Sequence, residues 1–560
     1  MLGSLRAHRD IQGSSVWTAG TMLIVLAVFA PVISLAVHAL TGSFAHWAHL
    51  ADSVIWRAGS NTLILLTGVG VLVACLGTGA AWLVSAYDFP TRKILNWALL
   101  LPLAVPTYII AFAYLDLWHP LGPIQSVMRD LLGIDSPRDF RLPDIRSLPG
   151  AIFLLGFVLY PYVYLSTRLM FITQAAGMIE AARILGEKPY GVLTRVALPL
   201  ARPAIAVGIS LALLETLNDI GASEFLGVQT MTVAVYTTWV TRGDLAGAAQ
   251  IALSMLIIVV FLIQLERQAR TRQRYSTVQR MRPMTLKRLS GGPMVLAIIL
   301  GWIPVVIGFV MPAAYLAHEA LSRLGSTGGL SPQLISAAWN TLSIALVATV
   351  ITLTCGLIVA WSTRRVRESA HGTSVTQWFA KGASIGYAIP GTIVAIGLLV
   401  PLVLVDNFLE RVLAIGGIDV TKLLLMGSTA GLLIAYTIRF LAISVGSFEA
   451  GLSRIPPSIE QASRLLGHGP TATLRRVHLP LLRPAMATAA LLIFVDIMKE
   501  LPATLLLRPM NFDTLATWLY AEAARGTYEE GAVAALLIVL VGLIPVILLA
   551  RTQSKPLLSR

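Results

Sequence analysis

Long apolar runs separated by short polar stretches dominate the chain. Residues 22–40 and 63–84 each hold about 20 positions without Asp, Glu, Lys or Arg, enough for a helix to cross about 30 Å of hydrocarbon. The runs lack the alternation, about ten residues per span, that is typical of membrane barrels. The pattern therefore predicts an all-α polytopic membrane protein with about twelve transmembrane helices.

The predicted spans fall into two sets of six. Those of the first half are expected near residues 17–40, 60–86, 95–118, 148–170, 203–224 and 247–265. Those of the second half are expected near residues 293–317, 340–362, 378–405, 423–447, 484–507 and 532–550. This spacing divides the chain into a first six-helix repeat (1–265), a basic cytoplasmic linker (266–292) and a second six-helix repeat (293–560).

A polar, basic segment centred on glycine occurs once in each half. Glu180 to Gly186 reads Glu-Ala-Ala-Arg-Ile-Leu-Gly, and Gln461 to Gly467 reads Gln-Ala-Ser-Arg-Leu-Leu-Gly, 281 positions later. Each copy ends in a Leu-Pro pair thirteen residues beyond its glycine, and Asn61-Thr62 is likewise repeated as Asn340-Thr341. Such repetition indicates one molecule built from two copies of one unit. Because both halves have six spans, the copies are expected to be parallel repeats.

Local chemistry suggests a shape for the repeated segment. The acid near its start suits a helix N-terminus, Gly186 and Gly467 permit a sharp turn, and Pro199 and Pro480 are expected to end a second short stretch. We therefore predict a short helix-turn-helix on the cytoplasmic surface that leads into the next span. A loop that merely rests on lipid headgroups is the alternative, but two copies with the same spacing favour a docking element.

Charge supports a cytoplasmic position for this segment. Only 12% of residues are charged, and the net charge is +14. The basic residues concentrate in the linker and after the second span of each half, for example at Arg364 and Arg365 in the second half. Residues 129–146, in contrast, hold four arginines and four aspartates. This is the positive-inside pattern. It places both termini in the cytoplasm and argues against nucleic-acid binding as the cause of the basic charge.

The chain lacks the phosphate-binding loop of an ATPase. That loop needs Gly-Lys followed by Ser or Thr, and none of the seven lysines follows a glycine. Transport would therefore be driven by ATP hydrolysis on another chain or by an ion gradient.

Four carboxylates are expected near the bilayer middle. Glu215 lies twelve residues beyond the proline that opens the fifth span of the first half, and Asp496 lies at the same place in the second half. Asp219 and Glu500 follow four residues later, which would put each pair on one helix face. Because ionisable groups at that depth usually face a cavity or a partner, we predict a path for a hard cation. In the alternative they are structural, with Lys499 neutralising Glu500. Histidines such as His478 show no ligand spacing and are expected in ordinary loops.

The repeated segment resembles the cytoplasmic signature of permease subunits of ABC importers. The matching residues of the first copy are Glu180-Ala181-Ala182, Gly186, Val196 and Leu198-Pro199. Those of the second copy are Ala462, Gly467, Val477 and Leu479-Pro480, with Gln461 at the position of the acid and Glu460 one position before it. The stretches from Asn218 to Thr230 and from Asp496 to Thr504 are more specifically similar to fused ferric-iron permeases.

This resemblance implies a type I ABC importer permease of the bacterial inner membrane. It implies a coupling helix in each half, seated on one of two separate ATPase subunits. We call residues 180–199 the first coupling segment and residues 460–480 the second. It further implies a periplasmic or lipid-anchored binding protein as donor, with ATP bound by the partner chains and no cofactor or catalytic residue in this chain. Other cargoes (a polyamine, thiamine or an organophosphonate) and a gradient-driven carrier remain alternatives at this point.

Overall fold

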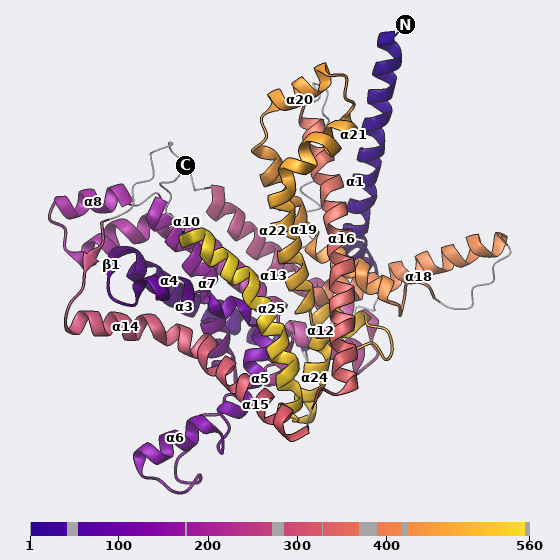
Figure 1. The fold of residues 1–560 in the computed structure, drawn as a ribbon. Coiled ribbons are helices and arrows are strands. Elements are labelled where there is room, and N and C mark those ends of the chain that lie inside the picture. Colours follow the sequence, from indigo (N-terminus) through magenta and orange to yellow (C-terminus); the bar gives the residue numbers. More distant parts are fainter. Residues whose placement is uncertain are drawn as a thin grey trace. The chain divides into compact units, whose positions relative to one another are not determined.

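The computed structural model describes residues 2–41, 54–173, 176–271, 285–327, 329–368, 389–416 and 423–554. Helices account for nearly all of the regular structure drawn in Figure 1. Within the described ranges, 11 helices are long and apolar enough to cross a membrane, or up to 12 if one bent pair counts as a span. The prediction of an all-α polytopic membrane protein is confirmed.

Contacts divide the chain into two compact units that each draw on both sequence halves. Unit 1 comprises Met1–Trp47, Thr238–Leu253 and Ile335–Thr517, and unit 2 comprises Ala48–Thr237, Ser254–Leu334 and Trp518–Arg560. The first helix of the chain thus groups with second-half helices. The division into repeats at residues 266–292 concerns the sequence and stays a prediction.

Unit 2 contains most helices of the first half. They are α3 (Trp56–Ala86), α4 (Arg92–Ala98), η2 (Leu101–Ala104), α5 (Thr107–Leu117), α6 (Pro123–Leu132), α7 (Leu148–Thr173), α8 (Ala176–Ile184), α9 (Pro189–Gly191), η3 (Val192–Ala197), α10 (Leu198–Asn218), α11 (Gly221–Phe225) and most of α12 (Met231–Val240). Later additions are most of α13 (Leu245–Thr271), then α14 (Gly292–Val305), η4 (Val306–Val310), α15 (Met311–Thr327) and α25 (Tyr528–Ser554). Two short parallel strands, β1 (Tyr87–Asp88) and β2 (Lys287–Arg288), pair the end of the linker with the loop after α3.

Unit 1 contains α1 (Leu2–Thr41) and the core of the second half. Its further helices are α16 (Pro332–Glu368), α18 (Gly391–Ile415), α19 (Thr429–Ser453), α20 (Pro457–Leu465), α21 (Pro470–Thr473), η6 (Leu474–His478), α22 (Leu479–Met498), α23 (Pro502–Leu507) and the start of α24 (Leu515–Arg525). Helix α1 packs against α18, and α19 packs against α22, with α20 and α21 at one end of that bundle (Figure 1).

The third predicted span of the first half is broken rather than continuous. The segments 92–104 and 107–117 meet at a bend of 93°. Pro106 is the residue before α5, with φ −57° and ψ 144°, and Pro390 holds the same place before α18. Both prolines fall within the continuous spans predicted near residues 95–118 and 378–405, but they lie at helix starts. The ring and the missing N–H suit a first turn better than a helix interior.

The repeated Asn-Thr pair performs the same structural task in each unit. Asn61 Nδ2 donates to the Gln229 carbonyl (3.2 Å), and Thr62 Oγ1 accepts from the Met231 N–H (3.0 Å). In unit 1, Asn340 donates to the Asp513 carbonyl (3.0 Å) and Thr341 accepts from the Leu515 N–H (2.8 Å). Each pair thus satisfies backbone groups at the start of a later helix, α12 or α24, which would otherwise lack partners.

Candidate functional site

The two coupling segments have the same backbone construction. A helix (α8 or α20) is followed by a glycine with positive φ, +83° at Gly186 and +80° at Gly467. Short helices α9 and α21 come next and run into α10 and α22. Glycine suits the turn because the left-handed region strains other residues. The predicted helix, glycine turn and second stretch are therefore present in both halves.

The second stretch does not end at the Leu-Pro pair, contrary to the prediction. One wide π-helical turn, η3 or η6, joins it to the next span, so that helix continues through residues 189–218. The Leu198 N–H bonds the Leu193 carbonyl, and the Leu479 N–H bonds the Leu474 carbonyl, both five residues back. The wider turn moves aside the carbonyl with which Pro199 or Pro480 would collide in a regular helix. Each coupling segment is thus continuous with a membrane-spanning helix.

Both coupling segments present large apolar side chains outward. Ile184 and Leu185 are 85% and 86% exposed, and Leu465 and Leu466 are 89% and 77% exposed. Each pair directly precedes the glycine turn. Two adjacent exposed aliphatic side chains at the same place in both copies form a surface suited to a protein partner. Ala181 and Ala462 are exposed on the same helices, whereas Ala182 is half-buried.

The acids of the two segments point to different surroundings. Glu180 Oε1 accepts from the Thr285 N–H (3.0 Å), and Arg183 donates to the Thr285 carbonyl (2.7 Å), so α8 holds the end of the linker. In the second segment Gln461 is exposed, while Glu460 is buried at 3% exposure. Glu460 faces inward one position earlier and therefore does not take the place that the half-buried Glu180 has in the first segment.

Glu460 instead meets two basic side chains inside unit 1. Arg364 Nε lies 2.6 Å from Glu460 Oε1, and His478 Nε2 lies 2.9 Å from the same oxygen. His478 is fully buried in η6, so its assignment to an ordinary loop was wrong. On sequence alone, Arg364 counts only as part of the positive-inside charge. An alignment of the halves on their Asn-Thr pairs could have singled it out, because it puts Arg364 where the first half has Ser85.

The carboxylate pairs do not lie on single helix faces. Helix α10 ends at Asn218 and α22 ends at Met498, both earlier than the predicted spans. Asp219 has an extended backbone (φ −78°, ψ 114°), and its Oδ1 accepts from the Ala222 N–H (2.8 Å) at the start of α11. Glu500 Oε1 likewise accepts from the Ala503 N–H (3.1 Å) in α23. The second acid of each pair caps the following short helix, because Asp and Glu can satisfy free N–H groups there.

In the second half both carboxylates form ion pairs. Lys499 Nζ lies 2.8 Å from Asp496 Oδ1. The lysine therefore neutralises Asp496, whereas the structural alternative expected it to neutralise Glu500. Glu500 Oε2 lies 3.2 Å from Arg439 Nε, and both side chains are below 10% exposed. Asp219, the first-half counterpart of Glu500, is buried at 7% exposure, and among the described residues it forms no ion pair. The two halves thus carry different ion pairing at equivalent sequence positions.

Next to Asp219, the segment 218–230 that resembles the ferric-iron permeases contains a second, half-buried acid. Glu224 in α11 accepts a hydrogen bond from the Tyr520 hydroxyl (2.6 Å), and Tyr520 stacks on Phe225. Burial raises the pKa of Glu224, and the hydrogen bond from Tyr520 opposes that rise. Within the described residues, no group of three His, Cys, Asp or Glu side chains is arranged to hold a metal ion.

Comparison with known proteins identifies the family. The model described as "binding-protein-dependent transport system inner membrane component" matches the chain twice, over residues 74–275 and 369–556. The chain belongs to this family. Each matched stretch contains one coupling segment, and the chain is therefore a duplicated ABC transport permease rather than a gradient-driven carrier.

Individual relatives differ in the cargo that their names give. The Fe(3+)-transport system permease protein FbpB 2 of Haemophilus influenzae is 25% identical over 500 residues, 89% of this chain and 90% of the relative. The probable ABC transporter permease protein y4fN of Sinorhizobium fredii is 24% identical over 506 residues, 86% of this chain and 84% of the relative. The putative 2-aminoethylphosphonate permease PhnV of Salmonella typhimurium is 28% identical over 267 residues, 45% of this chain and 91% of the relative.

Proposed function

We propose that this permease imports ferric iron, delivered by a periplasmic or lipid-anchored binding protein and driven by two separate ATPase subunits. The observation that carries the cargo is the likeness to the ferric permease, which extends over 89% of this chain and thus through both halves. ATP is bound by the partner chains, and this chain supplies the membrane path. The distribution of basic residues supports an orientation in the inner membrane with both termini in the cytoplasm.

The coupling segments explain how an ATPase would move this chain. Burial of an exposed leucine in a partner's groove stabilises a complex by about 1.5–3 kcal/mol before ordering costs. Leu185 and Leu466 offer that contact at equivalent places. Since helix is continuous from each coupling segment into α10 or α22, a displacement at the ATPase surface would reach the ends of those helices. Those ends carry Asp219 and Glu500.

The translocation path is proposed to use Glu215, Asp219, Asp496 and Glu500 unequally. Lys499 and Arg439 balance the charge of the two second-half acids. Asp219, which forms no ion pair among the described residues, therefore supplies the main attraction for a cation. We expect Asp219→Asn to reduce iron uptake strongly in complexes that still assemble, and Asp496→Asn to reduce it less. Uptake that is insensitive to Glu215→Gln and Asp219→Asn alike would remove these acids from the path.

ATP hydrolysis by the purified complex in lipid tests the function. The assay compares binding proteins loaded with ferric iron against the same proteins empty. Stimulation by the iron-loaded form alone is expected. Hydrolysis without any response to iron would keep the permease and remove this cargo, and failure of every ATPase to associate would contradict the coupling role of residues 180–199 and 460–480.

A 2-aminoethylphosphonate is the second candidate cargo, because the putative permeases PhnU and PhnV match about half of this chain each. Its negative phosphonate would be repelled by the Asp219 carboxylate in the path. Each of these relatives matches only 46% of the chain or less, whereas the ferric relative matches both halves. A binding protein loaded with 2-aminoethylphosphonate in the same hydrolysis assay distinguishes the two cargoes.

A further inference from the structure

Equivalent positions beneath the two coupling segments carry opposite chemistry. Helices α8 and α20 coincide in both bounds under the 281-residue offset, so Ile179 corresponds to Glu460 and Ala197 to His478. In the second helix of each half, the register set by the Asn-Thr pair aligns Trp82 with Trp361, and thereby Ser85 with Arg364. Three apolar or small residues of the first half are thus replaced by three charged or titratable residues in the second.

The guanidinium of Arg364 joins three elements of unit 1. Nε faces the Glu460 carboxylate on α20 at 2.6 Å. Nη2 donates to the Ile455 carbonyl at 3.0 Å, and Nη1 donates to the Leu452 carbonyl at the end of α19. Because the donors of a guanidinium are fixed in one plane, these contacts set both the distance and the angle between α16, α19 and α20.

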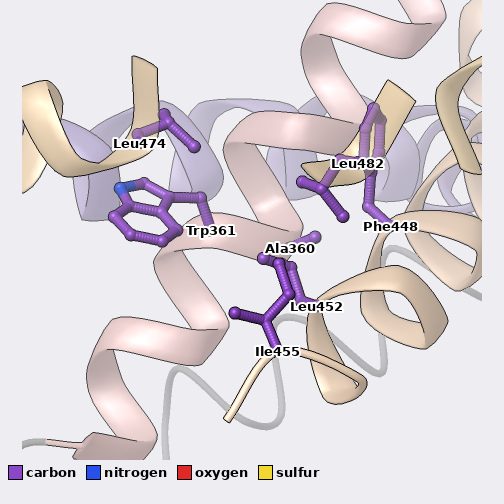
Figure 2. Close-up of a cluster of buried hydrophobic side chains, with 7 residues drawn as sticks. All are labelled: Ala360, Trp361, Phe448, Leu452, Ile455, Leu474 and Leu482. Carbon is purple, nitrogen blue, oxygen red and sulfur yellow. The ribbon is translucent and has the colours of Figure 1, made fainter. Parts of the chain in front are cut away.

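An apolar cluster packs beside this largely buried charged group, in which the Arg364 side chain is 13% exposed and the Glu460 side chain 5%. Figure 2 shows Trp361, Leu452, Ile455, Leu474 and neighbouring side chains from α16, the end of α19 and the second coupling segment. The Trp361 and His478 rings lie 4.9 Å apart. Leu452 and Ile455 therefore contribute side chains to the cluster and carbonyls to Arg364. In such surroundings a charge is tolerated only with its partners in place.

The first half holds α8 without this charged group. Ile179 and Ala197 are fully buried, and Ser85 is 4% exposed. Trp82 packs edge-on against Phe171 (5.5 Å) instead of against an imidazole. A hydroxyl pair repeats the contrast, because Ser463 and Thr473 bond each other at 2.9 Å, where the aligned first-half residues are alanine and valine.

We propose that Arg364, Glu460 and His478 are positioning residues that hold the second coupling segment to α16 and α19, a task done by apolar packing in the first half. The exposed Gln461 leaves that segment without an outward acid, while the inward Glu460 fixes it from behind. This inference rests on the proposed coupling to an ATPase. The three second-half residues together, or the three aligned first-half residues together, should hold the coupling segment in place. A mixture of the two should not hold it, because a buried charge is then left unpaired.

Variants that exchange the two sets test the proposal in complexes reconstituted with ATPase subunits and binding protein. Glu460→Gln should lower cargo transported per ATP hydrolysed by about tenfold or more, which corresponds to about 1.4 kcal/mol of lost coupling. The triple variant Arg364→Ser, Glu460→Ile, His478→Ala carries the first-half residues and should restore that ratio to within about twofold of the original. Glu410→Gln, the same chemical change at an exposed position of α18 outside the coupling segment, is the matched control.

The outcomes separate this inference from the proposed function. An unchanged transport-to-ATP ratio in Glu460→Gln overturns it, as does a triple variant that is no better than Glu460→Gln or does not assemble. Fewer assembled Glu460→Gln complexes with a normal ratio would show a purely structural role and overturn it too. Failure of the unaltered chain to bind any ATPase would count against the proposed function instead.

Discussion

The buried Arg439–Glu500 pair should be far more sensitive to loss of one charge than its neighbour Lys499–Asp496. Glu500→Gln keeps the size of the side chain and its acceptor for the Ala503 N–H. It removes only the charge that faces Arg439 at 3.2 Å. The guanidinium would then be left inside the protein without its counter-ion.

Geometry and burial set the magnitude. At 3.2 Å, an effective dielectric constant of about 20 gives an attraction of about 5 kcal/mol. Loss of one partner from a buried pair typically costs about 3–5 kcal/mol. The side chains of Lys499 and Asp496 are 33% and 23% exposed, so water can solvate the ammonium group when the carboxylate is removed. Asp496→Asn should therefore cost about 0–1 kcal/mol of stability.

Denaturant titration of the permease reconstituted in lipid measures the free energy of unfolding of each variant. We expect Glu500→Gln to lower the free energy of unfolding by at least about 2 kcal/mol more than Asp496→Asn. The double variant Arg439→Met, Glu500→Gln should recover most of that loss because no charge remains unpaired. Equal effects of the two single variants, or a double variant as unstable as Glu500→Gln, would refute the reasoning.

Two further predictions concern the repeated backbone features. Thr62→Val and Thr341→Val should each lower the free energy of unfolding by about 1–3 kcal/mol. The isosteric side chain leaves a buried N–H at the start of α12 or α24 without its acceptor. The same unfolding titration checks this, and a loss below about 0.5 kcal/mol in both variants would contradict it. Gly467→Val should weaken co-purification with the ATPase subunits, since φ +80° strains a branched residue by about 1–2 kcal/mol. Gly469→Ala, with open space around it, should leave co-purification unchanged. Equal yields for both variants would contradict a role of the glycine turn in docking.

Spans and repeats could be predicted because their signal is local and strong. A run of about 20 apolar residues has few alternatives to a membrane helix, and all twelve expected spans overlap helices that the structure describes. Element ends were less predictable. The expected span 203–224 carried helix through Asp219, whereas that acid ends α10 and caps the next helix. Sequence spacing could not show whether a carboxylate continues a helix or binds free N–H groups beyond it.

Charge pairing could not be predicted from neighbours along the chain. Lys499 is adjacent to Glu500 but follows the end of α22, and it pairs with Asp496 three positions back on that helix. Arg439, the true partner of Glu500, lies 61 positions earlier on α19. Arg364 similarly meets Glu460 from another helix. Each pair depends on tertiary packing that only the folded chain reveals.

The duplication preserves the backbone more closely than the charges. Both halves share the Asn-Thr clamp, the glycine turn with positive φ and the π-helical turn, and these features require only small or specific side chains. The basic residues that contact the buried Glu460 are not repeated, because Ser85 and Ala197 stand at the first-half positions aligned with Arg364 and His478. Within one chain the two copies need not remain interchangeable, since each needs only to present its docking surface and move its own span. Under the proposed function, Asp219 rather than the ion-paired Glu500 is therefore the acid that attracts the cargo.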